Sequence, residues 1–472
     1  MEKVIKYLWE STSKEKRELS PKNHFKKIGF DGEKPRLGWV RPPSWRLIEK
    51  SLKDCLKIIK DKKEFIFVGM GGSINGIKTV VSLKKKSFIF TLDSLDPQAL
   101  RDILSKLQYL KNTLVIAISK SATTKETQLI THSLKIIFKE KAKEHFLWLV
   151  DKDSYRKLDS LGWKNFFRLP IQVDSRQDCG GRFSCPHTLI FFLPLFLILN
   201  KNLRKLKKLY NRYRLLGNKI LGKAYYDAFR YRDTRRAYFS IRVRKDLLED
   251  FKTWITQLFQ ESLGSKKQDF PVKTIVRKRN GIGPLFNSLS LNMKIASPVV
   301  EIMSTMYYLE NFVAFYAFFK QINFVNQPYV EVYKQRMKKL SYKNIRSANS
   351  GDYKRLIYEI KENLKPHHKF IEIIFYFHPS KNIYEKIRRN FIKNFSKTKV
   401  LIFIGSDWNH HSYQAAFLDR YTLYVFLAKD SYQAKVPFIY PQSLKENIRT
   451  LKLISYATYL TLKDKSIFFT LR

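Results

Sequence analysis

The chain has 472 residues, enough for about two to four domains, and its hydrophobic content of 44% is ordinary for a globular protein, so general disorder is excluded. The 90 Lys and Arg residues against 41 Asp and Glu give a formal charge of +49, which would attract phosphates, nucleic acid or an anionic membrane. These basic residues are scattered through almost every segment and no nucleic-acid reader motif accompanies them, so a basic, solvated surface is favoured over specific nucleic-acid binding.

The cysteines and the apolar runs indicate the cellular compartment. Cys55, Cys179 and Cys185 form an odd set without a second pair at zinc-ligand spacing, which favours a reducing setting and no metal site. The first 18 residues carry charges where a signal peptide needs its apolar stretch. Residues 189–199, the longest apolar run, contain Pro194 and have about half the length of a membrane-spanning helix, so they are predicted to form a buried core helix. A cytoplasmic protein without a membrane segment is expected.

A strand-then-helix alternation begins near Glu64, after a lead-in that contains two tryptophans. Short apolar strands are predicted at EFIFV, SFIFTL, TLVIAIS and HFLWLV, each followed by a Gly-, Ser- or Asp-rich turn and an amphipathic stretch. A second series of strands, YFSIRV, PVKTIVRK, SPVVEIM, FIEIIFYF, KVLIFIG and TLYVFLA, follows a very basic helix. This alternation predicts α/β architecture with parallel sheets. Two domains are expected, one over residues 1–207 with the N-terminal segment and one over residues 208–472 with a C-terminal extension.

The first turn that could bind an anion is GMGGS, at residues 69–73, between the predicted strand EFIFV and a predicted helix. Glycines let backbone N–H groups approach an anion, and the N-terminus of the following helix adds a positive dipole. A dinucleotide fingerprint would need a glycine where the chain has Ile74, so an NAD site is disfavoured. Similar turns also occur without a ligand, so this turn alone leaves phosphate binding open.

The second turn, SKSATTKET at residues 119–127, follows the predicted strand TLVIAIS. Ser119, Ser121, Thr123 and Thr124 surround the start of a predicted helix, and Thr123 has capping-box spacing with Glu126. A helix cap needs one hydroxyl, so the surplus of hydroxyls favours a phosphate cradle over simple capping.

Together the two turns resemble the sugar isomerase (SIS) fold, in which such turns hold the phosphate of a sugar phosphate. Further along the chain, QDCGGRFSC, QLFQESLGS and NQPYVEVYK are similar to the glucose-6-phosphate isomerase family of that fold, and RLGW and LDSLDP also fit. The resemblance implies two SIS-type, flavodoxin-like domains. It also implies glucose 6-phosphate to fructose 6-phosphate interconversion in glycolysis and gluconeogenesis, without metal or organic cofactor, by a homodimer. The substrate-binding residues that it implies are Gly72, Ser73, Ser119, Lys120, Ser121, Thr124, Gly181 and Gln327.

Isomerising an aldose phosphate requires ring opening, removal of a proton next to a carbonyl and its return to the neighbouring carbon through an enediol. By position alone Glu261, near the end of a predicted helix, fits a solvated last-turn carboxylate, but the family's stretch QESLGS implies that it is the base. Arg182 in GGR would otherwise pair with a carboxylate such as Asp178, and the resemblance implies that it stabilises the enediolate. Lys334, six residues after the Pro of NQPYVEVYK, is implied to assist ring opening.

The ring-opening histidine has three candidate positions. The family's His-Ser motif would fall at Phe286-Asn287-Ser288, where this chain has Asn in place of His. A late stretch, GSDWNHHSYQ, resembles a His-Ser motif found in a subset of these isomerases that includes those fused to transaldolase, which assigns ring opening to His411. His410 is the alternative, and the absence of a third ligand at suitable spacing disfavours a metal site there.

Two other functions compete with an isomerase. A non-catalytic sugar-phosphate sensor would keep the phosphate turns but would not need Glu261, Arg182 and Lys334 together. A nucleic-acid-binding protein would explain the charge, and a salt-dependent gel shift at physiological ionic strength would support it.

Overall fold

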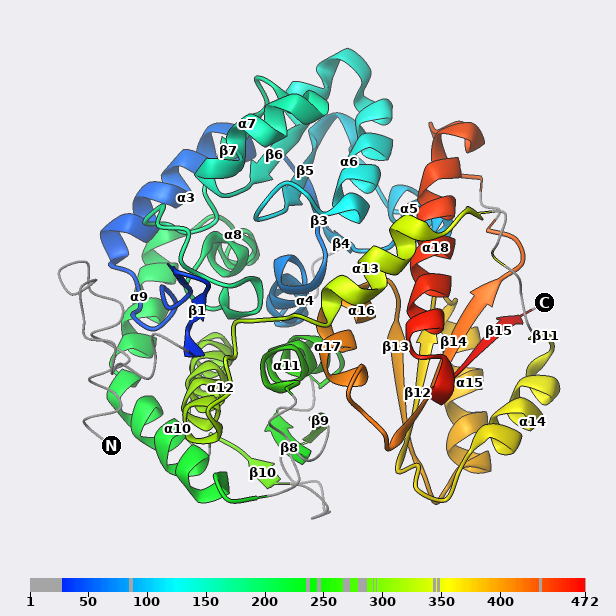
Figure 1. The fold of residues 1–472 in the computed structure, drawn as a ribbon. Helices are drawn as coiled ribbons and strands as arrows, with labels where there is room; N and C mark the ends of the chain where they lie inside the picture. Colours follow the sequence, from blue (N-terminus) through cyan, green and yellow to red (C-terminus); the bar gives the residue numbers. More distant parts are fainter. Residues whose placement is uncertain are drawn as a thin grey trace. The chain divides into compact units, whose positions relative to one another are not determined.

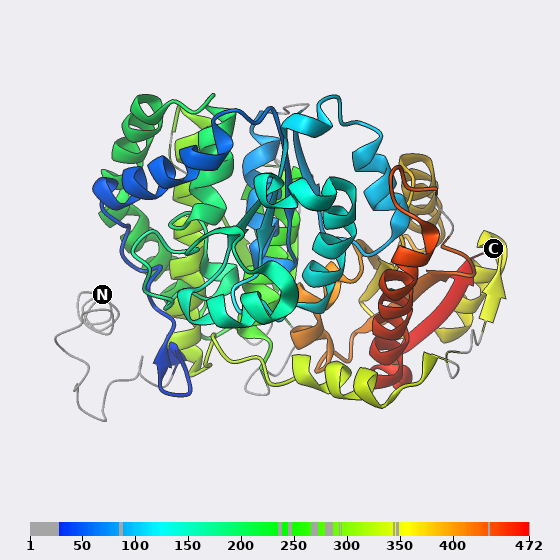
Figure 2. The same ribbon diagram turned by 90° about the horizontal axis from the view of Figure 1, so that it is seen from above.

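The computed structural model describes residues 28–84, 88–234, 238–243, 248–265, 272–278, 287–291, 293, 295–342, 345, 349–432 and 435–471 (Figures 1 and 2). The chain divides into two compact units: unit 1 is Met1–Thr91, Tyr109–Thr124 and Lys143–Asn326, and unit 2 is Leu92–Gln108, Lys125–Ala142 and Gln327–Arg472. The domain boundary expected after residue 207 falls within helix α9 of unit 1 and does not coincide with a boundary between the two compact units. The expected pair of SIS-type domains on that boundary stays a prediction.

The main sheet of unit 1 has the strand order β4-β3-β5-β6-β7. Its strands are β3 (Glu64–Val68), β4 (Ile89–Leu92), β5 (Thr113–Ile118), β6 (Phe146–Leu149) and β7 (Phe167–Leu169). The β3–β5, β5–β6 and β6–β7 pairs are parallel, and every residue of β3, β5 and β6 is buried, as expected for strands covered on both faces. In chain order this is the 2-1-3-4-5 arrangement of flavodoxin-like sheets, whose ligands bind where the order reverses, here beyond β3 and β5. Both predicted phosphate turns follow those two strands.

The helices of unit 1 form its core around this sheet and a second, smaller one. They are α3 (Trp45–Ile59), α4 (Asn75–Ser82), α7 (Tyr155–Leu158), α8 (Leu189–Ile198), α9 (Leu203–Arg214), α10 (Gly217–Tyr231), α11 (Leu248–Leu263) and α12 (Pro298–Lys320). All residues of α8 are buried, which confirms the predicted core helix. Helix α11 packs on α4, α12 and β9, and α10 lies beside α12 (Figures 1 and 2).

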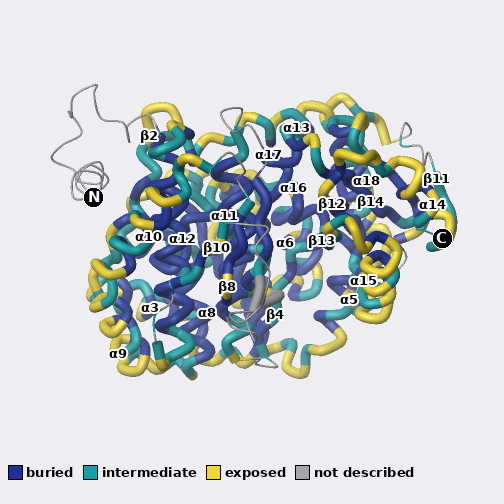
Figure 3. Tube along the Cα trace, turned by 90° about the horizontal axis from the view of Figure 1, so that it is seen from below, coloured by how far each residue is buried: buried dark blue, intermediate teal, exposed yellow. Residues whose placement is uncertain are grey.

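The second sheet of unit 1 is three-stranded and parallel, with the order β10-β8-β9. It consists of β8 (Tyr238–Val243), β9 (Lys273–Lys278) and β10 (Asn287–Leu289), and a short antiparallel ribbon, β1 (Phe30–Asp31) with β2 (Lys34–Pro35), lies near the start of the described chain. The strand expected at SPVVEIM is wrong, because these residues form the first turns of α12. Pro298 suits the first turn of a helix, and α12 is buried on all sides over most of its length, so its β-branched residues pack in a helical core (Figure 3).

Unit 2 is built on a parallel sheet with the order β11-β15-β14-β12-β13. Its strands are β11 (Asn349–Gly351), β12 (Phe370–Phe375), β13 (Lys399–Ile404), β14 (Thr422–Lys429) and β15 (Ser466–Leu471). Its helices are α5 (Pro97–Leu104), α6 (Lys125–Phe138), α13 (Val330–Lys339), α14 (Tyr353–Asn363), α15 (Lys381–Asn394), α16 (Asp407–His411), α17 (Tyr413–Ala416) and α18 (Lys445–Thr461). Strands β12 and β14 are almost wholly buried, whereas α14 and α15 have exposed outer faces (Figure 3).

The sheets confirm the expected fold class, α/β with parallel sheets and flanking helices. Within the described residues, no helix is both long and apolar enough to cross a membrane.

Candidate functional site

The glycine-rich turn of unit 1 is held against the turn that carries Arg182. Residues Gly71–Ser73 form a short 3₁₀ helix after β3, and Gly71 has a positive φ of 54° that favours glycine. Residues Gly181–Phe183 form a second 3₁₀ turn. A side chain on Gly72 would meet the backbone carbonyl carbon of Gly181 at 2.2 Å, so the two turns touch through backbone atoms. The structure therefore brings together two motifs that are more than 100 residues apart.

The hydroxyl-rich turn follows β5, the strand next to β3. Ser119 is buried and donates a hydrogen bond to Thr124 Oγ1 at 3.3 Å, whereas Ser121 is exposed and shares a 2.6 Å hydrogen bond with Thr123. Ala122 takes a left-handed conformation with a φ of 54°, which bends the chain between Ser121 and Thr123. The expected hydroxyl cluster is present, and its binding of phosphate stays a prediction.

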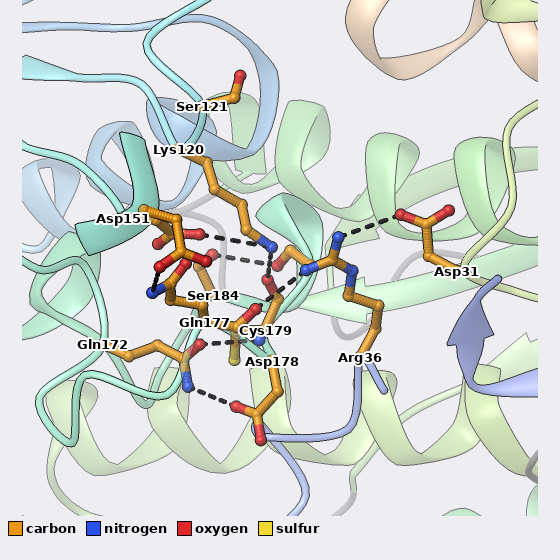
Figure 4. A network of polar contacts seen from close by, with 12 residues as sticks. Asp31, Arg36, Lys120, Ser121, Asp151, Gln172, Gln177, Asp178, Cys179 and Ser184 are labelled. Atoms are coloured by element: carbon orange, nitrogen blue, oxygen red, sulfur yellow. Dashed lines mark hydrogen bonds and ion pairs between the residues drawn. The ribbon is translucent and has the colours of Figure 1, made fainter. Parts of the chain in front are cut away.

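Lys120 belongs to a polar network of unit 1 (Figure 4). Its Nζ donates to the carbonyl oxygen of Cys179 at 2.5 Å and lies 3.9 Å from Asp151 Oδ2. Burial lowers the pKa of Lys120, and burial also raises the pKa of Asp151 to about 6, with the charges of Lys120 and Arg36 acting against that rise. Both pKa shifts favour the neutral forms of the two groups, which agrees with the long distance between Lys120 Nζ and Asp151 Oδ2. The ammonium therefore anchors the segment that precedes Gly181 and Arg182.

The proposed proton-transfer residues form a buried ion pair in unit 1. Arg182 Nη1 lies 3.2 Å from Glu261 Oε1, and the two side chains are 5% and 10% exposed. The rest of the guanidinium is held by Ser262 Oγ, at 2.7 Å from Nε, and by the carbonyl oxygens of Phe324 and Val325, at 2.5 and 3.2 Å from Nη2. Burial lowers the pKa of Arg182, and the carboxylate of Glu261 opposes that shift. Glu261 is thus a buried carboxylate rather than a solvated last-turn one.

One residue at this pair was missed in the sequence. Gln257 lies four residues before Glu261, on the same face of α11, and its Nε2 donates to Glu261 Oε2 at 2.9 Å. The helical i, i+4 spacing of QLFQE was the signal that could have identified it.

Two adjacent histidines of unit 2 have different surroundings. His410 is 21% exposed, and its Nε2 lies 2.9 Å from Oε1 of Glu126, in the first turn of α6. His411 is 1% exposed, its Nδ1 is 2.6 Å from Ser412 Oγ, and its Nε2 is 3.9 Å from Asp407 Oδ2. His411 is therefore enclosed by its own segment, whereas His410 faces a carboxylate from the hydroxyl-rich motif.

His410 and Glu126 stabilise each other's charged forms. Burial by itself lowers the pKa of His410, but the charge of Glu126 reverses this effect and the pKa lies above its ordinary value. Burial by itself raises the pKa of Glu126, but the charge and hydrogen bond of His410 outweigh it and hold that pKa below its ordinary value. The positive charge of Lys334 acts on both groups. Each group therefore favours the charged form of the other, at the carboxyl end of a parallel strand.

The remaining predicted residues are placed as follows. Lys334, on α13, donates to Glu331 Oε1 at 2.8 Å and is 40% exposed. Gln327 is half-buried in the loop before α13. Asn287, the third ring-opening candidate, begins β10 in unit 1 and donates to Thr234 Oγ1 at 3.3 Å, while Phe286 lies outside the described residues. Across the described part of the chain, no three His, Cys, Asp or Glu side chains gather as a metal site would require.

Parts of the chain are similar in sequence to known proteins. Residues 55–157 match the family model of phosphoglucose isomerase. A glucose-6-phosphate isomerase from Campylobacter jejuni is 30% identical over 262 residues, which cover 51% of this chain and 59% of that relative. A probable glucose-6-phosphate isomerase from Natronomonas pharaonis is 39% identical over 67 residues, or 14% of this chain and 15% of that protein.

A solved structure of a hypothetical protein from Thermus thermophilus superposes with a TM-score of 0.51 at 19% identity, covering 72% of this chain and 94% of that one, and it supports the fold alone. The late His-Ser motif and its subset stay a prediction. The family match includes both the glycine-rich and the hydroxyl-rich turn. The predicted resemblance of this chain to the glucose-6-phosphate isomerase family is therefore confirmed.

Proposed function

We propose that the protein is a glucose-6-phosphate isomerase that interconverts glucose 6-phosphate and fructose 6-phosphate. The observation that carries the proposal is the buried Arg182–Glu261 pair beside the backbone contact of Gly72 with Gly181. A carboxylate and a guanidinium in one water-poor setting are what an enediol mechanism needs, since one moves the proton and the other stabilises the oxyanion.

In the proposed reaction, Glu261 removes the proton from C2 of the open-chain aldose, and the electron pair moves to form an enediolate whose oxygen charge Arg182 stabilises. Glu261 then returns the proton to C1 while the proton of the C2 hydroxyl moves to O1, which yields the ketose without any net redox change. The phosphate group is held by the two turns of unit 1, through Gly72, Ser73, Ser119, Lys120, Ser121, Thr124 and Gly181, and Gln327 also contributes to substrate binding. No metal or organic cofactor takes part in these steps.

Ring opening must precede proton transfer, and it requires a proton at the ring oxygen and removal of one from the anomeric hydroxyl. We assign this step to His410, with Lys334, in place of His411. His410 has a partly exposed imidazole whose protonated form Glu126 favours, whereas His411 is enclosed and hydrogen-bonded to Ser412. Homodimer formation remains part of the proposal through the family resemblance, and cytoplasmic location remains part of it through the cysteine usage.

The first test is an isomerase assay with fructose 6-phosphate on the wild type and on Glu261→Gln. Removing the base should lower kcat by about 10³-fold or more while substrate binding persists, in line with the usual contribution of a general base and its surroundings. Glu359→Gln is a matched control, because Glu359 is also a buried carboxylate paired with an arginine, at 2.7 Å from Arg355 in unit 2. Binding without turnover by the wild type would instead support a sugar-phosphate sensor or regulator.

A second test separates the two histidines. His410→Gln should lower kcat by about 10²-fold with little change in melting temperature, whereas His411→Gln should lower mainly the melting temperature because it disrupts a buried contact. The opposite pattern would return the ring-opening role to His411.

A further inference from the structure

Two buried side-chain amides form a chain of hydrogen bonds between the helix that follows the glycine-rich turn and Glu261. Asn75 is the first residue of α4, two positions after Ser73, and its Nδ2 donates to Gln257 Oε1 at 3.1 Å. Gln257 Nε2 in turn donates to Glu261 Oε2 at 2.9 Å. Asn75 and Gln257 are 0% and 2% exposed, so neither amide exchanges its hydrogen bonds freely with water.

The Asn75 donor decides which end of the Gln257 amide faces the carboxylate. A glutamine amide has an acceptor at one end and a donor at the other. Because Asn75 occupies the acceptor, Nε2 is directed to Glu261. Without that donor, the amide loses a contact at its oxygen that helps to hold Nε2 towards the carboxylate, and the position of Nε2 relative to Glu261 shifts. The orientation of Glu261 therefore depends on a residue that does not touch it.

Burial alone does not favour an asparagine at position 75. Its Oδ1 is buried and has no hydrogen-bond partner among the described residues. A buried carbonyl oxygen without a donor is unfavourable, so an apolar side chain of similar size would suit the core better. The contact that Asn75 does make is the donation to Gln257, and that contact ends at Glu261.

We propose that Asn75 is a positioning residue, which sets the orientation of Glu261 through Gln257 and couples it to the glycine-rich turn. This inference rests on the proposed isomerase function. The rate of proton transfer depends steeply on the position of the base, so a displaced carboxylate slows the transfer without weakening binding of the substrate's phosphate group.

The test compares Asn75→Ala with Asn311→Ala. Asn311 is a matched control, because it is also a fully buried helical asparagine of unit 1, with an amide that donates to Tyr307 O at 2.7 Å. Steady-state rates are measured with glucose 6-phosphate and with the same substrate deuterated at C2. For Asn75→Ala we expect kcat to fall about 10-fold, KM to change less than about twofold, and the deuterium isotope effect on kcat to rise, because proton transfer becomes slower than the other steps. Asn311→Ala should change the melting temperature but not the isotope effect.

Asn75→Leu provides a second variant that fills the volume and removes the donor, and it is used if the alanine variant does not fold. The inference is overturned if the wild type is active and a folded Asn75 variant keeps kcat and the isotope effect unchanged. It is also overturned if that variant matches the Asn311 variant in both. The proposed function stands in either case. An inactive wild type overturns the proposed function, and this inference with it.

Discussion

Replacing Gly72 by alanine should separate the two turns that meet at the Arg182–Glu261 pair. The added Cβ would lie 2.2 Å from the carbonyl carbon of Gly181, 2.4 Å from its oxygen and 2.6 Å from the backbone nitrogen of Arg182. All three atoms belong to the backbone, so no side-chain rotation relieves the overlap. One of the two turns has to move.

The size of the movement follows from those distances. Ordinary van der Waals contact begins at 3.4 Å, so the carbonyl carbon of Gly181 has to retreat by about 1.2 Å, the difference between 3.4 and 2.2 Å. The guanidinium of Arg182 is fixed at its far side by Ser262 and Phe324, so the backbone shift distorts its position relative to Glu261. A displacement of about 1 Å in a reacting site costs roughly 10²-fold in rate, and overpacking costs about 1–3 kcal/mol of stability.

The assay is kcat/KM for fructose 6-phosphate together with the unfolding free energy from denaturant titration. Gly222→Ala is the matched control, because Gly222 lies inside α10 and a Cβ added there would have no atom within 4 Å beyond its own helix backbone and chain neighbours. That substitution should leave kcat/KM unchanged and stabilise the protein by up to about 1 kcal/mol, since alanine is the better helix former. A folded Gly72→Ala protein with wild-type kcat/KM would refute the reasoning.

Two further substitutions probe buried ionisable groups in unit 1. Glu310 of α12 is fully buried, neither of its oxygens has a hydrogen-bond partner among the described residues, and burial holds its pKa well above the ordinary value. The folded state therefore keeps a proton that the unfolded chain loses near pH ~4.3, so this group lowers the unfolding free energy by about 1.4 kcal/mol per unit as pH rises from there towards the folded-state pKa. Glu310→Gln should remove that part of the slope in denaturant titrations from pH ~5 upwards, and an unchanged slope would contradict it. Arg182→Lys should lower kcat/KM by about 10²-fold or more, because an ammonium cannot replace the guanidinium contacts to Ser262, Phe324 and Glu261 at once. Initial rates within about threefold of wild type would count against the assigned role.

Prediction from sequence succeeded where the signal was local. The strands β3, β4, β5 and β6 were found because each is a short apolar run bounded by turn residues, and α8 because an interrupted apolar run of its length suits a buried helix. It failed at α12, where Val299, Val300 and Ile302 suggested a strand. A helix buried on all sides has no apolar stripe, so periodicity could not distinguish it from a buried strand.

The amino-acid sequence by itself determined the α/β class, the glycine-rich and hydroxyl-rich turns and the family resemblance, because motifs and strands are patterns of consecutive residues. Only the tertiary structure decided which side chains act together. It brings Glu126 to His410 across 284 positions, and Arg182 to Glu261 beside a backbone contact of two glycines. Such pairings depend on how strands order themselves in a sheet and how helices pack on it, and no local pattern of residues carries that information.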